Sequence, residues 1–229
     1  MKLEIYSDII CPWCYIGKVR LDKALETLGD KVDFEVVWRP FELNPSMSPE
    51  GMCRKEYRTC KFGSWERSLE MDKELTTKAA AEGLTFNLDK LTRTPSTFKG
   101  HRLLWFAEQA DQRGEAKLGL KTSGKAKGIQ EEVARLLFDS YFTCGADIGD
   151  VEVLADIAAV AGLDREEVKS FLNSDKGETE VKAEAQRGIR LGISGVPAFV
   201  LEGDVIASGA QTPEQFSELL SRVYANYSV

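Results

Sequence analysis

Apolar and polar residues alternate at the start of the chain and then change to a helical spacing. Residues 2–7 alternate, which predicts a β-strand. Over residues 14–25 apolar positions recur every three or four residues, which predicts a helix. Residues 32–38 predict a second strand. The first 40 residues therefore predict strand, helix and strand, a βαβ unit whose crossover we expect to be right-handed.

The centre of the chain has helical spacing and almost no strand pattern. One predicted helix, at 101–107, is strongly apolar, and Asp150 and Asp164 are predicted N-caps because each directly precedes an apolar run. Residues 114–128 are rich in lysine and glycine and predict a mobile loop. The other predicted helices open at 49–51 or cover 73–82, 129–142, 151–161, 165–172 and 178–191.

Strand patterns return near the end of the chain. Residues 198–201 and 205–208 predict two strands, and the turn-forming residues between them predict a hairpin. Thr212 then predicts the N-cap of a last helix, with Pro213 in its first position and Gln215 completing a capping box.

The order of these elements is that of a thioredoxin fold carrying an insertion. Without the helical block, a strand–helix–strand unit meets a strand–strand–helix unit. We therefore predict an α/β protein with a thioredoxin-like domain at 1–45 and 193–229. A large all-helical domain is predicted at 46–192, inserted between its halves.

Size and charge exclude several classes of function. The chain has 229 residues, of which 43% are hydrophobic, so it can bury a substantial core. Its net charge of -7 is not the electrostatic footprint of a nucleic-acid or anionic-membrane binder. The sequence has no apolar run of the roughly 18 residues that a membrane span needs. It also opens without a signal-peptide pattern, so we expect a cytoplasmic protein.

The cysteines direct attention to one short segment, Cys11-Pro12-Trp13-Cys14. Five cysteines in a chain of this length do not indicate a disulfide scaffold, and a close pair in a reducing compartment is more typical of catalysis or metal binding. Cys11 lies at the predicted helix start, where unpaired backbone N–H groups favour a thiolate. Cys14 lies one turn later and can close a disulfide. The spacing predicts Cys11 as the attacking sulfur and Cys14 as the resolving one.

A second feature is a proline directly before a predicted strand. Proline cannot donate to a strand ladder, so Pro197 is unusual there. One explanation is a cis bond between Val196 and Pro197 that brings this loop against another part of the fold. Beside Cys11, such a loop would expose the Val196 backbone to a substrate peptide that adds as a strand.

Together these residues resemble a known family. Cys11-Pro12-Trp13-Cys14 and Gly195-Val196-Pro197-Ala198 resemble the DsbA-like branch of the thioredoxin superfamily, in particular its cytosolic FrnE-like subgroup. The resemblance runs over the whole chain, including WRPFELNP, HRLLWFA, SYFTCGADIGD and SGVPAFVLEGDVIASGAQTPEQF.

The resemblance implies a thiol–disulfide oxidoreductase or isomerase. Cys11 would be the nucleophile, Cys14 the resolving thiol and Pro197 the cis-proline. Its partners would be protein or small-molecule disulfides and thiols, with glutathione a candidate redox partner and no bound cofactor. In one respect the chain departs from related proteins. These often carry a buried acid at the position of Ile5, and Asp8 is the nearer acid that could replace it.

Several alternatives stay open at this stage. A zinc site would need Cys53 and Cys60 as further ligands, but seven helical residues separate sulfurs by about 10 Å. The same spacing argues against a second redox pair. Cys144 is expected to be a lone thiol. Glutathione-dependent kappa-class transferases and hydroxychromene-carboxylate isomerases resemble the chain in fold order, yet typically have serine at the position of Cys11. The third hypothesis for the function is a non-catalytic chaperone in which the cysteine pair senses the redox state.

Two further residues are candidates for substrate contact or for support of the site. His101 is expected to be a hydrogen-bonded histidine at a helix start, or to face the Cys11 cleft and help hold the thiolate. Trp13, between the two cysteines, is expected to be exposed, where it could touch substrate or stiffen the turn.

Overall fold

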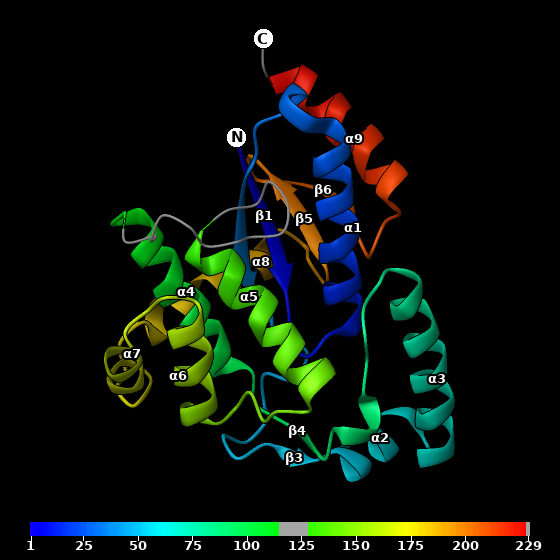
Figure 1. The fold of residues 1–229 in the computed structure, drawn as a ribbon, viewed down its shortest axis with the longest axis vertical. Helices are drawn as coiled ribbons and strands as arrows, with labels where there is room; N and C mark the ends of the chain where they lie inside the picture. The colour runs from blue at the N-terminus through cyan, green and yellow to red at the C-terminus, as the bar shows by residue number, and fades with distance from the viewer. Residues whose placement is uncertain (115–127, 228–229) are drawn as a thin grey trace.

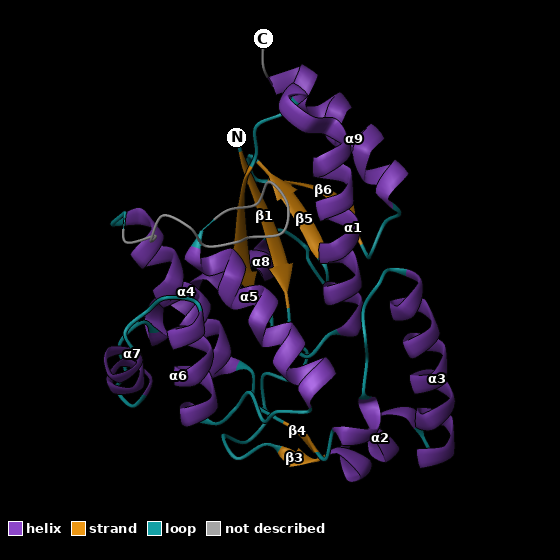
Figure 2. Ribbon diagram, in the orientation of Figure 1, coloured by secondary structure: helices purple, strands orange, loops and turns teal. Residues whose placement is uncertain are grey.

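The computed structural model describes residues 1–114 and 128–227, and the predicted loop lies almost entirely outside them. The central sheet has the strand order β2-β1-β5-β6 (Figures 1 and 2). β1 pairs in parallel with β2 and antiparallel with β5, and β5 pairs antiparallel with β6. The bounds of these strands are Lys2–Ser7, Glu35–Pro40, Ala198–Leu201 and Asp204–Ser208 for β1, β2, β5 and β6. The predicted thioredoxin fold is confirmed.

Helices cover both faces of this sheet. On one face α1 (Pro12–Leu28) packs beside α9 (Pro213–Tyr227), and Leu3 and Ile5 of β1 join that core. On the other face Tyr6 lies against α8 (Glu178–Arg190). A Cβ at Gly188 of α8 would lie 2.7 Å from the Tyr6 ring, so this close approach requires glycine. The helix α8 thus covers the sheet although it belongs to the segment 46–192, whose bounds as a domain stay a prediction.

The segment between the halves of the sheet is helical, as predicted, with one correction. The chain does not enter a helix at 49–51. Instead β3 (Met52–Cys53) pairs antiparallel with β4 (Arg93–Thr94), and this pairing holds the backbone extended until Arg54. The helices of this segment are α2 (Arg54–Phe62), α3 (Trp65–Ala81), α4 (Phe98–Gln112), α5 (Ile129–Asp139), a π-helix (Ser140–Cys144), α6 (Val151–Val160), α7 (Arg165–Leu172) and α8.

The predicted helix caps are confirmed by their hydrogen bonds. The side chains of Asp150 and Asp164 accept from backbone N–H groups in the first turns of α6 and α7. Thr212 Oγ1 accepts from Gln215 N, and Gln215 Oε1 accepts from Thr212 N, which completes the capping box of α9. Within the described ranges, none of the helices is long and apolar enough to cross a bilayer.

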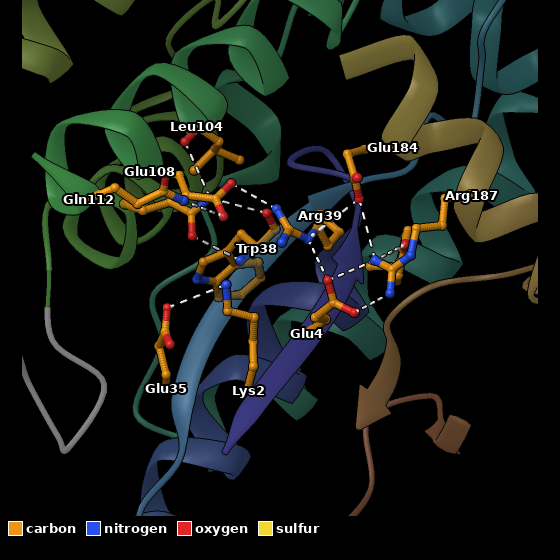
Figure 3. Close-up of polar contacts among 12 residues, drawn as sticks. Lys2, Glu4, Glu35, Trp38, Arg39, Leu104, Glu108, Gln112, Glu184 and Arg187 are labelled. Carbon is orange, nitrogen blue, oxygen red and sulfur yellow. Dashed lines mark hydrogen bonds and ion pairs between the residues drawn. The ribbon is translucent and has the colours of Figure 1, made fainter. Parts of the chain in front are cut away.

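A charged network joins the sheet to α4 and α8 (Figure 3). Glu4 of β1 accepts from Arg39 of β2 at 2.7 Å and from Arg187 of α8 at 2.7 Å. Arg39 also donates to Glu108 of α4 at 2.7 Å. Burial raises the pKa of Glu4, but the hydrogen bonds from Arg187 and Arg39 outweigh burial and hold it below its usual range. The network therefore fixes α4 and α8 against β1 and β2.

Arg102 of α4 has an unusual set of partners, because its buried guanidinium donates only to backbone carbonyls. These belong to Phe171, Leu172, Ser174 and Lys176, at distances of 2.7 to 3.2 Å. The guanidinium also lies 4.9 Å from the centroid of the Phe171 ring. A single side chain thus satisfies the carbonyl end of α7 and the turn that follows it.

We expect Arg102→Met to lower the free energy of unfolding by about 2–3 kcal/mol, because the carbonyls of Leu172, Ser174 and Lys176 lose the guanidinium as their donor. Urea denaturation followed by circular dichroism measures this. Arg135→Met is the matched control. Arg135 forms a partly exposed pair with Glu132, three residues away on α5, and its loss should cost less than about 1 kcal/mol. Equal unfolding midpoints for the two variants would contradict the prediction.

Candidate active site

The two cysteines lie where β1 passes into α1. Cys11 is the N-cap of α1 with extended backbone angles, and Pro12 is the first helical residue. The Cys11 N–H donates to the Asp8 carbonyl at 2.9 Å, and the Cys14 N–H donates to the Cys11 carbonyl at 3.0 Å. Both thiols are free, and Cys11 and Cys14 are 5% and 1% exposed. The local sequence thus places Cys11 at the start of α1, as predicted.

The two thiols differ in acidity because of their surroundings. A hydrogen bond from Cys14 lowers the pKa of Cys11, although burial opposes this effect. Burial raises the pKa of Cys14 well above its ordinary value, and donation to Cys11 raises it further. Of the two thiols, Cys11 therefore ionises more readily, and Cys14 holds its proton more strongly.

The loop before β5 lies directly against this pair. The Val196–Pro197 peptide bond is cis. The Cys11 thiol donates to the Val196 carbonyl, with an S···O distance of 3.8 Å. A Cβ at Gly17 of α1 would lie 3.1 Å from Pro197 Cγ, so glycine at this position allows the helix to approach the loop. The structure thus brings Cys11, Val196 and Pro197 together across a long separation in sequence.

A buried acid and the histidine lie behind the cysteine pair. Asp8 is 0% exposed, and its carboxylate accepts from the backbone N–H groups of Ile10 at 3.4 Å and Leu43 at 2.7 Å. His101 of α4 is 2% exposed, and its Nε2 lies 3.8 Å from Asp8 Oδ1. Neither ring nitrogen of His101 makes a hydrogen bond within the described part of the chain. The expectation of a hydrogen-bonded histidine is therefore wrong, because the distance from Nε2 to the Asp8 carboxylate is longer than a hydrogen bond.

With this geometry in place, comparison with known proteins identifies the family. The model of the DSBA-like thioredoxin domain matches residues 2–221. The chain belongs to this family. A solved structure described as a probable DsbA oxidoreductase from Streptomyces coelicolor is 35% identical over 98% of this chain and 90% of its own, with a TM-score of 0.81.

Two more distant structures share the fold of this DSBA-like chain. One is the cytosolic disulfide reductase DsbM from Pseudomonas aeruginosa, solved with GSH. It is 18% identical over 100% of both chains, with a TM-score of 0.64. The other is a 2-hydroxychromene-2-carboxylate isomerase, 14% identical over 100% of this chain and 98% of its own, with a TM-score of 0.66. At these identities the likeness concerns the fold alone.

Around the DSBA-like cysteine pair the structure adds two residues that the sequence did not indicate, Lys78 and Glu42. Trp13 is 36% exposed, as expected, and the Lys78 ammonium of α3 lies 5.0 Å from its ring centroid. Glu42, in the loop after β2, faces His101 and Asp8. Burial raises the pKa of Glu42, and the charge of His101 opposes this. Helical periodicity and loop composition identify neither residue, because both contacts depend on packing between distant segments.

A cavity of about 640 Å³ opens beside this group of residues. It lies between the loop after β2 and α8, and Phe41, Glu42, Lys182, Gln186 and Ile193 are among the residues that line it. Glu42 therefore belongs both to the cavity wall and to the charged group around His101. The cavity offers apolar walls with a few polar groups next to the cysteine-bearing end of the sheet.

The remaining cysteines lie apart from one another on the surface. Cys53, Cys60 and Cys144 are free and exposed. Cys53 is the N-cap of α2 and Cys60 lies near the end of the same helix, so helical residues separate them, as the spacing argument assumed. Residues 1–114 and 128–227 contain no group of three or more His, Cys, Asp or Glu side chains arranged to hold a metal ion.

Proposed function

We propose that the protein catalyses thiol–disulfide exchange on protein or small-molecule disulfides through Cys11 and Cys14. The observation that carries this is the unequal pair at the start of α1. There the pKa of Cys11 is lowered by the Cys14 thiol, while Cys14 is buried with its pKa raised. A two-step exchange needs a more acidic thiol that attacks first and a neighbouring thiol that reacts second.

In the reductive direction the Cys11 thiolate attacks one sulfur of the substrate disulfide. The substrate S–S bond breaks, a mixed disulfide forms at Cys11, and the first substrate thiolate leaves and takes a proton. Cys14 then loses its proton and attacks Cys11 Sγ, which releases the second substrate thiol and leaves the Cys11–Cys14 disulfide. The substrate gains two electrons and the protein dithiol loses them. The reverse sequence oxidises dithiols.

The loop of Val196 and Pro197 would hold the substrate in this reaction. The Val196 carbonyl lies within hydrogen-bonding reach of Cys11, so a peptide adding as a strand along Val196 would present its disulfide to that sulfur. Pro12 and Trp13 flank the same position, and Trp13 is exposed enough to contact a bound chain.

Glutathione in the cytosol is the redox partner that we propose. The support is the shared fold with DsbM, a cytosolic disulfide reductase solved with GSH. A glutathione-dependent isomerase or transferase and a redox-sensing chaperone are the competing functions. The presence of two cysteines of unequal acidity favours exchange over the isomerase or transferase, because that chemistry needs no resolving thiol.

The test is the redox state of Cys11 and Cys14 across a series of glutathione buffers, measured by alkylation and peptide mass mapping. We expect a two-electron transition confined to this pair, with a midpoint between about -270 and -120 mV. The exposed Cys53, Cys60 and Cys144 serve as internal controls, which should form only mixed disulfides with glutathione. A Cys11–Cys14 pair that stays reduced throughout the series would disprove the proposed function.

A further inference from the structure

The histidine behind the cysteine pair makes an interaction that ordinary packing does not explain. A buried imidazole without hydrogen bonds is costly, because a polar group has left water without gaining a partner. His101 Nε2 lies 3.8 Å from Asp8 Oδ1, and neither ring nitrogen forms a hydrogen bond within the described residues. When the ring carries its second proton, this contact becomes an ion pair with the carboxylate. His101 is therefore placed where a positive charge on its ring would offset the charge of Asp8.

Asp8 connects this ion pair to the reactive sulfur. Its backbone carbonyl accepts from Cys11 N, and its carboxylate is fixed by the N–H groups of Ile10 and Leu43. The side chain is fully buried, so water screens its charge poorly. The hydrogen bond from Cys14 lowers the pKa of Cys11, and the Asp8 charge is among the effects that raise it. A negative charge on Asp8 that no cation offsets would thus raise the pKa of Cys11 and leave less of its thiolate.

Resting on the thiol chemistry proposed above, we propose that His101 is a positioning residue whose positive charge neutralises Asp8 and so keeps Cys11 readily ionised. Asp8 and His101 act on Cys11 with opposite signs, through space, and neither touches the substrate. Asp8 has a second role in this arrangement, since it holds the turn before Cys11 and the loop after β2 together.

Other ionisable groups also lie around this pair. Glu42, from the loop after β2, faces His101 and Asp8, and Lys182 of α8 acts on Glu42. Tyr141, from the π-helix, lies within range of the Asp8 charge, and burial raises its pKa, so it stays neutral. Cys11 and Cys14 complete the group on the α1 side. His101 therefore faces two carboxyl groups, those of Asp8 and Glu42.

The test measures the alkylation rate of Cys11 with iodoacetamide between pH 4 and 9, with peptide mass mapping to assign the reacted thiol. The background carries Cys53→Ser, Cys60→Ser and Cys144→Ser, which removes the exposed thiols. At pH values below the Cys11 pKa, Asp8→Asn should raise the rate about threefold to tenfold, and His101→Phe should lower it by a similar factor, since one pKa unit is a tenfold change in thiolate. The double variant should return to within about twofold of the background.

A merely structural role of Asp8 and His101 would not change the alkylation rate in opposite directions, nor would the two changes cancel in the double variant. The proposal is wrong if both single variants change the rate in the same direction, or if neither changes it by more than about twofold. Asp22→Asn is the matched control, a buried carboxylate further along α1, and it should leave the pH profile unchanged. Asp8→Ser and His101→Gln, which make the same changes of charge, replace any variant that does not fold. Because the assay measures the reactivity of Cys11 and not turnover, it is independent of the redox titration that tests the proposed function.

Discussion

Cys11→Ser is expected to lower the rate of thiol–disulfide exchange by on the order of a thousandfold or more, the scale on which loss of an enzymatic nucleophile acts. A hydroxyl cannot replace the thiolate that α1 and Cys14 favour at this position. Reduction of a fluorescent peptide disulfide in glutathione buffer measures the rate. If more than about a tenth of the activity remained, Cys11 would not be the nucleophile.

Companion variants separate the two thiols and the competing functions. Cys14→Ser should accumulate the mixed disulfide between Cys11 and the substrate, which mass spectrometry detects, because no resolving thiol remains. Cys60→Ser is the matched control, an exposed cysteine outside the site, and should leave the rate unchanged. If the protein were a chaperone alone, suppression of aggregation would persist in Cys11→Ser and no exchange would be found in the wild type.

The second large effect is expected from substitution of Lys18, and it concerns the stability of the fold. It is a buried lysine on α1, one helical turn after Cys14, and its side chain is 3% exposed. Its ammonium lies 2.6 Å from Glu131 Oε1 of α5 and 2.7 Å from Asp22 Oδ2. Glu131 Oε2 in turn accepts from Trp38 Nε1 of β2 at 2.7 Å. One lysine thus compensates two carboxylates and joins α1, α5 and the sheet.

We expect Lys18→Met to lower the free energy of unfolding at pH 7.5 by about 3–5 kcal/mol, because it leaves buried carboxylates without a cation. Urea denaturation provides the measurement. Lys23→Met, on the same helix, is the matched control. Lys23 forms a half-exposed pair with Glu82, and its loss should cost less than about 1 kcal/mol. A loss for Lys18→Met no larger than that of the control would show that the buried pairs contribute little.

The loss in free energy of unfolding caused by Lys18→Met should also depend on pH. Burial raises the pKa of Asp22 to about 6 in the folded protein, although Lys18 opposes the rise. Because this folded pKa lies above the unfolded value, the stability that Asp22 contributes is present at low pH and is lost as the pH rises from about 4 to 6. Without Lys18 the pKa of Asp22 should rise further. The destabilisation should therefore be smaller at pH 5, where Asp22 is protonated, than at pH 7.5.

Much of this protein is determined by its sequence over short distances. The alternation at 2–7, the two strand segments at 198–201 and 205–208, the caps Asp150 and Asp164, and the capping box at Thr212 all predicted what the structure contains. Such features follow from local periodicity and from hydrogen bonds between near neighbours. The placement of Cys11 at a helix start is of the same kind, since Pro12 and the turn before it are local signals.

Only the tertiary structure decided which charged residues are buried and which partners they have. His101 meets Asp8, and Lys18 meets Glu131, between segments that no periodic pattern relates. The position of Lys18 on the apolar side of α1, between Tyr15 and Leu21, was the one signal of its burial. A sequence pattern indicates which face of a helix is inward. The free energy of a buried charge depends instead on the groups that packing brings within a few ångströms of it, and these are set by the whole fold.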